Sequence, residues 1–517
     1  MRTCLWSRAT LRTMAAAILG ASLTAGPACS TDFQPKACST DGDCGANVCD
    51  VVPGATSEVA CVPAASATLQ IGMSAPISGP EQELGTDMKL GVTLAFDAQN
   101  AAGGIRGRKL ALDFMDDEYQ PTLAEANARA LVNVQATTTP PVCPSTTDTT
   151  VTGTPMISQT GLERGPGAVL AFLGNVGTPT MLRAAPVSVE TGTLFFGAFT
   201  GATTMLRDTT AGACAQYIFN VRTSYAEEAN ATVQFFFNQG VPDYTHLVSF
   251  DQDDSFGDAG YAGLVAAYTT LKGFPASLAA SATPIARFQY TRGDDASVPP
   301  AVQGATAYLA TLLAADSAPH TVGIMMTDTY GPAAEFIQGV RQWQYASGPE
   351  QTMLQMATRL TLYMSNVSFV GPNSLSSRLV AAGTISAPGG AVPYTQGVYV
   401  SQVVPNYESD TSDIVTEYQQ AIKAAGQTET FTSLEGYIDA RVFIAGMLAH
   451  QGPFTPDGLV ATFEALPDLS LGMGPSNGYS AQNHQYLTSV WGTGIQPNGT
   501  FANVYFWSNG LPIQFYQ

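Results

Sequence analysis

Residues 71–119 constrain the fold most, because they carry the pattern of a strand, a helix and a second strand. A short apolar run at residues 69–73 is followed by the turn Ser78-Gly79-Pro80. Apolar residues then recur at helical spacing up to Gly103-Gly104, where glycine accepts the positive φ of a helix end. A further apolar run at residues 109–114 predicts the second strand. The pattern predicts a βαβ unit, either purely structural or with a ligand at the carboxyl end of its first strand.

Length and charge narrow the class of protein. A chain of 517 residues is too long for one core, which predicts two globular lobes with additional segments. The chain is 45% hydrophobic and 12% charged, as expected for a packed rather than a disordered protein. A formal net charge of -20 argues against nucleic-acid binding and against an anionic membrane surface as partner, because both require basic faces.

The N-terminus has the pattern of an export signal, with arginines ahead of an apolar run at residues 14–23. This run is too short to span a bilayer. The stretch Gly26-Pro27-Ala28-Cys29 resembles the lipobox of bacterial lipoproteins, whose cysteine is lipidated after cleavage. Gly26 replaces the usual leucine, so a released protein is the alternative. We expect a signal peptide at residues 1–28 and an exported, periplasmic or cell-surface lipoprotein anchored only through Cys29.

Six cysteines remain once Cys4 leaves with the signal and Cys29 carries lipid, an even number in an oxidising compartment. A segment with almost no apolar residues holds four of them, Cys38, Cys44, Cys49 and Cys61. Disulfides would have to order that segment. Zinc is the competing interpretation, although the segment has no CxxC pair and no histidine. We predict two disulfides of open connectivity in a stalk and linker at residues 29–66. Cys143 and Cys214 are candidates for a third disulfide.

Strand-like and helix-like runs alternate along the rest of the chain, as a parallel sheet requires. Each strand-like run ends in small, hydroxyl, amide or acidic residues. Such ends suit a cleft lined by loops and helix N-termini, whose free N–H groups bind anions, although the same residues also make ordinary turns. Strands are predicted at residues 168–174, 194–197, 217–221, 246–250, 322–326 and 367–370.

Two stretches, Met73-Ser74-Ala75-Pro76-Ile77-Ser78-Gly79-Pro80 and residues 95–110, resemble the start of the type I periplasmic binding proteins. More narrowly, they are similar to the branched-chain amino acid and amide receptors of ABC transporters. Residues 221–228, 401–405 and 433–437 support the resemblance, which covers residues 68–503. It implies an α/β fold of two doubly wound parallel-sheet lobes joined by a three-strand hinge, here preceded by a small Cys-rich module.

The resemblance also implies domain boundaries. Three hinge strands would cross near Gln216, Val404 and His484. Lobe I would then comprise residues 67–215 with 404–484, and lobe II would comprise residues 216–403 with 485–517.

By the same resemblance, a ligand carboxylate or carbonyl would meet Thr178 and the loop residues Thr200 and Gly201. Tyr225, after the first crossing, would supply an aromatic contact, and Ser78 and Leu84 would contribute to the rim. Each residue also has an ordinary structural interpretation: a helix N-cap for Thr178, a turn at residues 200–201, and surface packing for Tyr225.

One position departs from the amino acid receptors of this family, which place a glutamate after a Gly-Pro pair to bind the ligand ammonium. Here Asn373 follows Gly371-Pro372 and cannot neutralise a buried positive charge. Asp328 or Asp254 would have to compensate from a neighbouring loop. Otherwise the sequence favours an amide, a carboxylate without an amine, or another small polar metabolite.

The chain offers no recognisable catalytic constellation, so we predict no enzyme, no cofactor and no metal. None of the four histidines has metal-ligand spacing, and neither a G-x-S-x-G nor a P-loop pattern occurs. Asp116-Asp117-Glu118 lacks the spacing of a Ca²⁺ loop. Glu435 and Asp439, four residues apart on a predicted helix, fit a solvated face better than an acid/base pair.

These observations predict an extracytoplasmic solute-binding receptor that closes two lobes on an amino acid, amide or carboxylate. Its protein partner would be an ABC transporter permease. The alternative is a surface sensory or scaffold protein that keeps the bilobed ligand-binding fold without a transport role.

Overall fold

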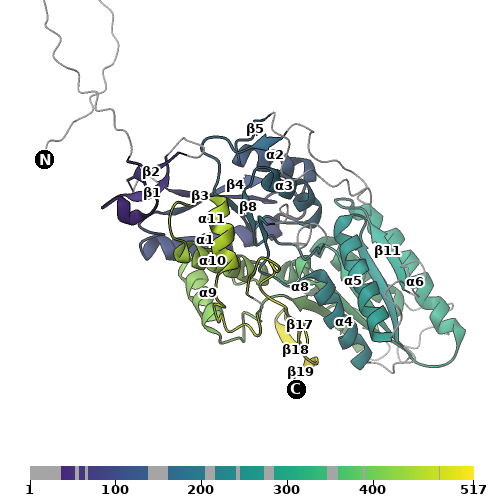
Figure 1. Ribbon diagram of the computed structural model, residues 1–517. Helices are drawn as coiled ribbons and strands as arrows, with labels where there is room; N and C mark the ends of the chain where they lie inside the picture. Colours follow the sequence, from purple (N-terminus) through teal and green to yellow (C-terminus); the bar gives the residue numbers. More distant parts are fainter. Residues whose placement is uncertain are drawn as a thin grey trace, which may run out of the picture.

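Two sheets, joined by three connecting segments, form the frame of the molecule in the computed structural model (Figure 1). The structure describes residues 36–52, 58–63, 68–137, 161–203, 216–239, 245–272, 285–345, 359–387, 390–476 and 478–516. The predicted export signal, Cys29, Cys143 and Cys214 lie outside the described residues. No helix in the described part of the chain is long and apolar enough to cross a membrane.

The first sheet has the strand order β4-β3-β7-β8-β9 and is parallel throughout. The predicted βαβ unit is confirmed, because β3 and β4 pair in parallel and flank helix α1. The elements of this part are β3 (Leu69–Ala75), α1 (Gln82–Ala101), β4 (Leu110–Asp116), α2 (Pro121–Leu131), β5 (Gln135–Ala136), β6 (Leu162–Glu163), β7 (Ala171–Leu173), α3 (Thr178–Glu190), β8 (Leu194–Phe196) and β9 (Ile218–Phe219).

Three later helices, drawn in green in Figure 1, join the first sheet, namely α9 (Asp413–Ala424), α10 (Phe431–Ala449) and α11 (Pro456–Glu464). Helix α10 packs along α1, and α11 contacts α10 and β8. We call the five-stranded sheet with these helices the first lobe, and the eight-stranded sheet with its helices the second lobe.

The second sheet has the order β11-β10-β12-β13-β16-β17-β18-β19, with its first five strands parallel and its last three added antiparallel. Its strands are β10 (Thr245–Gln252), β11 (Ala286–Tyr290), β12 (His320–Thr327), β13 (Leu360–Val367), β16 (Val398–Gln402), β17 (Ser489–Ile495), β18 (Phe501–Ser508) and β19 (Gln514–Phe515). Around it lie α4 (Tyr225–Gln239), α5 (Ser255–Lys272), η6 (Asp295–Ser297), α6 (Val298–Ala315), α7 (Tyr330–Tyr345), α8 (Pro372–Ala382) and the hairpin of β14 (Thr384–Ala387) and β15 (Gly390–Pro393).

The strand predicted at residues 367–370 is wrong. Strand β13 ends at Val367, and Ser368–Val370 form the 3-10 helix η7. Glu228 on α4 accepts hydrogen bonds from both the backbone N–H and the hydroxyl of Ser368, at 2.7 and 3.0 Å. The chain leaves the sheet at this point because a buried side chain from another element satisfies the backbone donor that a strand neighbour would otherwise take.

The chain passes between the lobes three times, after β9, after β16 and before β17, which confirms the predicted three-strand connection. The first and third passages run side by side. The backbone N–H of Asn220 donates to the carbonyl of His484 at 2.8 Å, and that of Leu487 donates to the carbonyl of Val221 at 2.8 Å. The residue numbers at which the lobes divide stay a prediction.

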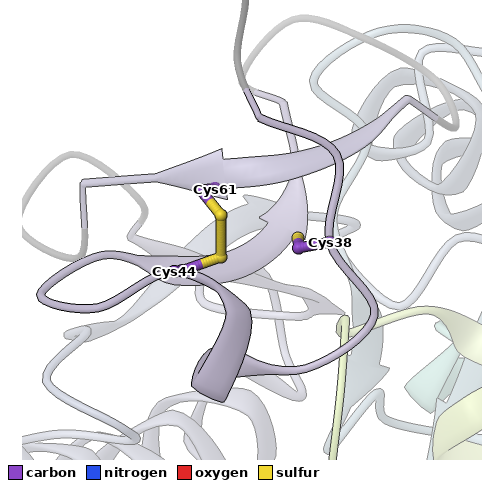
Figure 2. A group of neighbouring side chains, drawn as sticks. All are labelled: Cys38, Cys44 and Cys61. Atoms are coloured by element: carbon purple, nitrogen blue, oxygen red, sulfur yellow. A yellow bond between two sulfur atoms is a disulfide. The ribbon is translucent and has the colours of Figure 1, made fainter.

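A small module precedes the lobes and contains η1 (Asp41–Asp43), β1 (Val48–Val51) and β2 (Val59–Val62). The two predicted disulfides are confirmed, with the connectivity Cys38–Cys49 and Cys44–Cys61. Figure 2 shows the Cys44–Cys61 bond, with Cys38 beside it. The sulfur atoms of Cys38, Cys44 and Cys61 lie within 4.8 Å of one another, but the disulfides leave none of them as a thiolate for zinc.

Candidate functional site

The loops that follow β7 and β8 bring two threonines together at the carboxyl edge of the first sheet. The hydroxyl oxygens of Thr178 and Thr200 lie 2.7 Å apart, and both residues are buried. Thr178 is the first residue of α3, whose N-cap is Gly177, so the alternative N-cap interpretation of Thr178 does not apply. Two hydroxyl groups therefore sit together at the N-terminus of a helix, where the helix dipole and free N–H groups favour an anion or carbonyl oxygen.

Tyr225, the first residue of α4 in the second lobe, contacts the loop after β8. We call the group formed by Thr178, Thr200 and Tyr225 the threonine corner. The backbone N–H of Tyr225 donates to the carbonyl of Gly201 at 2.8 Å. A Cβ on Gly201 would lie 2.5 Å from the Tyr225 ring, so only glycine permits this approach. The predicted contacts at Thr178, Thr200, Gly201 and Tyr225 thus come together. Burial raises the pKa of the Tyr225 phenol to about 12, which keeps its hydroxyl protonated.

An aromatic cluster joins the lobes next to this corner. Phe369, in η7 of the second lobe, lies 4.8 Å from Phe199 of the first lobe and 4.8 Å from Phe256, measured between ring centroids. Tyr119 lies 6.1 Å from Phe369. The predictions missed Phe199, Phe256 and Phe369. The signal that could have found them is their place in or beside loops that follow strands.

Next to the aromatic cluster, an ion-pair network connects the two lobes. Arg222, in the first connecting segment, binds Glu435 of α10 at 3.1 Å and Glu228 of α4 at 2.9 Å. It also donates to the hydroxyl of Ser368. All four side chains are buried. The predicted solvated face at Glu435 and Asp439 is wrong, because α10 packs against α1 and both side chains are buried.

Asn373 forms its hydrogen bonds with residues other than the two threonines. Its side-chain N–H donates to the Tyr407 hydroxyl at 2.7 Å, and its side-chain oxygen accepts from the backbone N–H of Phe431 at 3.1 Å. Tyr407 precedes α9 and Phe431 begins α10, so the amide joins α8 to the first lobe. In this arrangement, both polar atoms of the Asn373 amide are engaged with protein groups.

The two predicted rim residues lie in the β3–α1 connection. The hydroxyl of Ser78 donates to Asp116 at 2.6 Å and so stabilises the turn. Leu84 is buried against Gly371 of the second lobe, where a Cβ would lie 2.8 Å from the Leu84 Cδ2 atom. Leu84 therefore belongs to the contact between the lobes, whereas the Ser78 hydroxyl bonds within the first lobe.

The two aspartates proposed as alternatives differ in their partners. Asp254 forms an ion pair with Arg292 at 3.3 Å and accepts from the backbone N–H of Phe256 at 2.9 Å. Asp328, directly after β12, is 0% exposed, and neither carboxyl oxygen has a side-chain hydrogen-bond partner among the described residues. Of the two, only Asp254 is part of an ion pair among the described residues.

Comparison with protein families gives one match over most of the chain. The model described as "Periplasmic binding protein" matches residues 68–167 and 166–500. Over 69 residues the chain is 39% identical to the Leu/Ile/Val-binding protein homolog 3 of Brucella melitensis, and over 76 residues it is 36% identical to the Leu/Ile/Val-binding protein BraC3 of Rhizobium johnstonii. These matches span 19% and 21% of the two relatives, about a fifth of their length.

Solved structures resemble the whole bilobed part. A possible leucine/isoleucine/valine-binding protein from Rhodopirellula baltica has a TM-score of 0.64 and 27% identity, over 86% of this chain and 98% of that one. A fatty acid ABC transporter substrate-binding protein from Thermomonospora curvata shares the fold at a TM-score of 0.60 and 15% identity, over 90% and 96% of the two chains. A solute-binding protein from R. palustris in complex with benzoate shares it at 0.59 and 16%, over 87% and 98%.

Proposed function

Because the chain belongs to the periplasmic binding protein family, we propose that it is an extracytoplasmic, non-catalytic receptor that closes its lobes on a small polar ligand. The observation that carries the proposal is the buried corner of Thr178, Thr200 and Tyr225, which joins the N-termini of α3 and α4 across the two lobes. The ligand class is an amino acid, an amide or a carboxylate, and the receiving partner is an ABC transporter permease.

The corner suits a carboxylate or carbonyl oxygen for a physical reason. Each hydroxyl can rotate its proton toward a ligand, and the helix N-termini add partial positive charge. Tyr225 begins α4 of the second lobe, whereas the two threonines belong to the first, so a ligand between them would be bound more strongly when the lobes are closed. Such a difference in affinity shifts the hinge equilibrium toward the closed state, which is the form that docks on a transporter.

The names of the similar proteins refer to several different ligands. The relatives are named for leucine, isoleucine and valine, and two of the structures for fatty acid and benzoate. A carboxylate is common to all of these ligands, which supports the assignment of the threonine corner to a carboxylate. Export and the lipid anchor at Cys29 complete the proposal and rest on the N-terminal sequence.

A sensory or scaffold role is the second candidate. The observation that favours it is the disulfide module, which contacts the first lobe through Asp41 and Asp50 and adds a surface of its own. Deleting the gene and measuring uptake of the identified ligand separates the two roles. Loss of uptake supports delivery to a permease, whereas unchanged uptake supports sensing or assembly.

The test of the proposed function is a thermal-shift screen of the purified protein against amino acids, amides and small carboxylates. We expect one class to raise the melting temperature. Thr178→Ala and Tyr225→Phe should each weaken binding of that class by about 10-fold to 100-fold, since each removes a hydrogen bond to a charged or strongly polar group.

Matched controls are Thr270→Ala and Tyr516→Phe, which change the same residue types at exposed positions and should leave the affinity unchanged. A screen without any stabilising compound, or binding that survives both site variants, would contradict the proposed site.

A further inference from the structure

The first lobe contains a buried arginine whose charge is balanced by a carboxylate of the disulfide module. The side chain of Arg108, in the loop between α1 and β4, is 0% exposed. Among the described residues, its guanidinium forms an ion pair only with Asp50 of β1. Burial lowers the pKa of Arg108, and the charge of Asp50 opposes that effect. A buried charge that loses its partner is costly, so the first lobe depends on the module at this position.

The module also contacts a second segment of the first lobe. Asp41, in η1, pairs with Arg106 of the same loop, and Arg106 donates to the carbonyl of Gly452. The backbone N–H of Phe454 donates to Asp50 at 3.1 Å. Gly452 and Phe454 lie between α10 and α11. The module therefore joins the loop after α1 to the loop after α10, and these two helices pack along each other.

The module has little apolar packing of its own to hold the two aspartates in place. Its described residues contain one buried apolar cluster, which consists of Val48 and Val62 with Val52 packed against them. Strands β1 and β2 pair over four residues each, and an isolated hairpin is at best marginally stable in water. A cluster this small does not offset the conformational entropy that is lost when the segment becomes ordered.

The two disulfides connect the parts of the module that carry the aspartates. Cys49 directly precedes Asp50 in β1 and is bonded to Cys38, which lies ahead of η1. Cys44, directly after η1, is bonded to Cys61 of β2 (Figure 2). Both disulfides thus join η1, which contains one aspartate, to the β1–β2 hairpin, which contains the other.

We propose that the disulfide module is a redox-dependent clamp on the first lobe. With both disulfides formed, it holds Asp41 and Asp50 against Arg106 and Arg108 and joins the loops that follow α1 and α10. With both disulfides reduced, it releases the two loops and leaves Arg108 without its counter-ion. The clamp lies at the amino edge of the first sheet, before β4, whereas the threonine corner lies at the carboxyl edge. The clamp is therefore separate from the proposed ligand site.

The clamp opens by thiol–disulfide exchange with an added dithiol. One thiolate of the dithiol attacks a sulfur of the module, which forms a mixed disulfide and releases one cysteine thiolate. The second thiol then closes a cyclic disulfide and releases the other cysteine. Each bond takes up two electrons and two protons to give two cysteine thiols. A disulfide oxidant outside the cytoplasm drives the reverse reaction, so a chain that has not been exported would lack the clamp.

Thermal denaturation of the purified protein, with and without a dithiol, tests the proposal. Reduction should lower the wild-type melting temperature by about 5 to 10 °C, because Arg108 loses its partner. Asp50→Asn/Arg108→Met removes both charges, and the asparagine keeps an acceptor for the Phe454 N–H. Reduction should therefore lower the melting temperature of this variant by less than half as much. Both proteins contain Cys143 and Cys214, so any effect of that pair cancels in the comparison.

Glu125→Gln/Arg129→Met is the matched control. It makes the same two changes in a partly exposed ion pair of 3.0 Å on α2, away from the module. Reduction should lower the melting temperature of this control by as much as it does in the wild-type protein.

Hydrogen exchange locates the effect and needs no charge variant. The backbone N–H groups of Ile105 and Arg108 each bond to the other residue's carbonyl, and that of Phe454 bonds to Asp50. After reduction, these three amides should exchange about tenfold faster or more, whereas the amides of β12 in the second lobe should keep their rates. A variant with Cys38→Ser, Cys44→Ser, Cys49→Ser and Cys61→Ser should reproduce the fast exchange without any dithiol.

A melting temperature that does not change on reduction, or that falls equally in wild type and in Asp50→Asn/Arg108→Met, overturns the clamp. Unchanged exchange at the three amides of the reduced protein also overturns it. Neither experiment uses a ligand, so failure of the clamp leaves the proposed receptor function standing. A failed ligand screen, in turn, leaves the clamp standing.

Discussion

At the scale of single residues, several carboxyl groups are buried inside the folded protein. Glu81, just before α1, is 6% exposed and interacts electrostatically with Asp295 and Arg292 of the second lobe. Burial, with a further contribution from Asp295, raises the pKa of Glu81 to about 7. Burial likewise raises the pKa of Asp117 to about 7. In the folded protein, these groups hold protons that an unfolded chain would release at lower pH.

This difference predicts a pH-dependent stability. The folded-state pKa of Glu81 is raised, so its contribution is fully present below the ordinary value of 4.5 and is lost as the pH rises to about 7. The apparent melting temperature should therefore fall between about pH 4.5 and pH 7. Glu81→Gln should remove up to about 3 kcal/mol of the change in the free energy of unfolding across this pH range. Thermal denaturation at a series of pH values measures it.

Glu83→Gln is the control for Glu81→Gln, because Glu83 is an exposed residue two positions along the chain. A pH slope that is the same in wild type and in Glu81→Gln would show that burial of Glu81 does not affect stability.

At the scale of elements, helices α1 and α10 cross with their backbones in contact. A Cβ on Gly91 of α1 would lie 2.0 Å from the carbonyl oxygen of Ser433 on α10. A Cβ on Gly436 of α10 would lie 2.5 Å from the carbonyl oxygen of Met88 on α1. Two glycines thus allow an approach that no larger residue permits, and the approach helps to bury Glu435 on the same helix.

We expect Gly91→Ala to destabilise the protein by roughly 1–3 kcal/mol or more, because the added methyl group meets backbone atoms that cannot move aside. The control is Gly331→Ala on α7, where a Cβ meets no atom within 4 Å. There alanine should be neutral or slightly stabilising, since it favours a helix more than glycine does. Thermal denaturation of both variants gives the comparison, and equal melting temperatures would contradict the close crossing.

At the scale of the whole molecule, the disulfide module packs against the first lobe rather than forming an independent domain. Asp41 binds Arg106, and Asp50 binds Arg108, whose side chain is 0% exposed. The backbone N–H of Phe454 donates to Asp50 at 3.1 Å, and the Arg108 guanidinium lies 4.4 Å from the centroid of the Phe454 ring. The module is thus fixed to one lobe, and a stalk role for it stays a prediction.

Breaking this contact should be costly. Asp50→Asn removes the ion pair of a fully buried arginine, which we expect to destabilise the first lobe by about 3 kcal/mol or more. The control Glu125→Gln removes partly exposed ion pairs with Arg129 and Arg183 and should cost less than about 1 kcal/mol. Thermal denaturation checks both values. Equal effects of the two variants would show that the module is only loosely attached.

The sequence by itself determined the class of fold and the covalent frame of the module. Strand and helix patterns depend on residues close together in the chain, so the βαβ unit at residues 71–119 and the later strands β7, β8, β9, β10 and β12 could be predicted, whereas the other later strands were not. The strand predicted at residues 367–370 failed because a distant residue, Glu228, bonds to Ser368 and turns the chain. The number of disulfides followed from counting cysteines, whereas their pairing required their positions in space.

Only the tertiary structure decided which side chains form the candidate site and which of them are buried or paired with a charge. Glu435 has the spacing of a surface residue, yet the fold brings it to Arg222, 213 positions away in the chain. Likewise, the sequence named Asp328 or Asp254 as an acidic group that could compensate for Asn373, and only the fold paired Asp254 with Arg292 and buried Asp328 without a side-chain partner among the described residues. The physical reason is that burial and charge pairing arise from contacts between distant segments, which local sequence patterns do not encode.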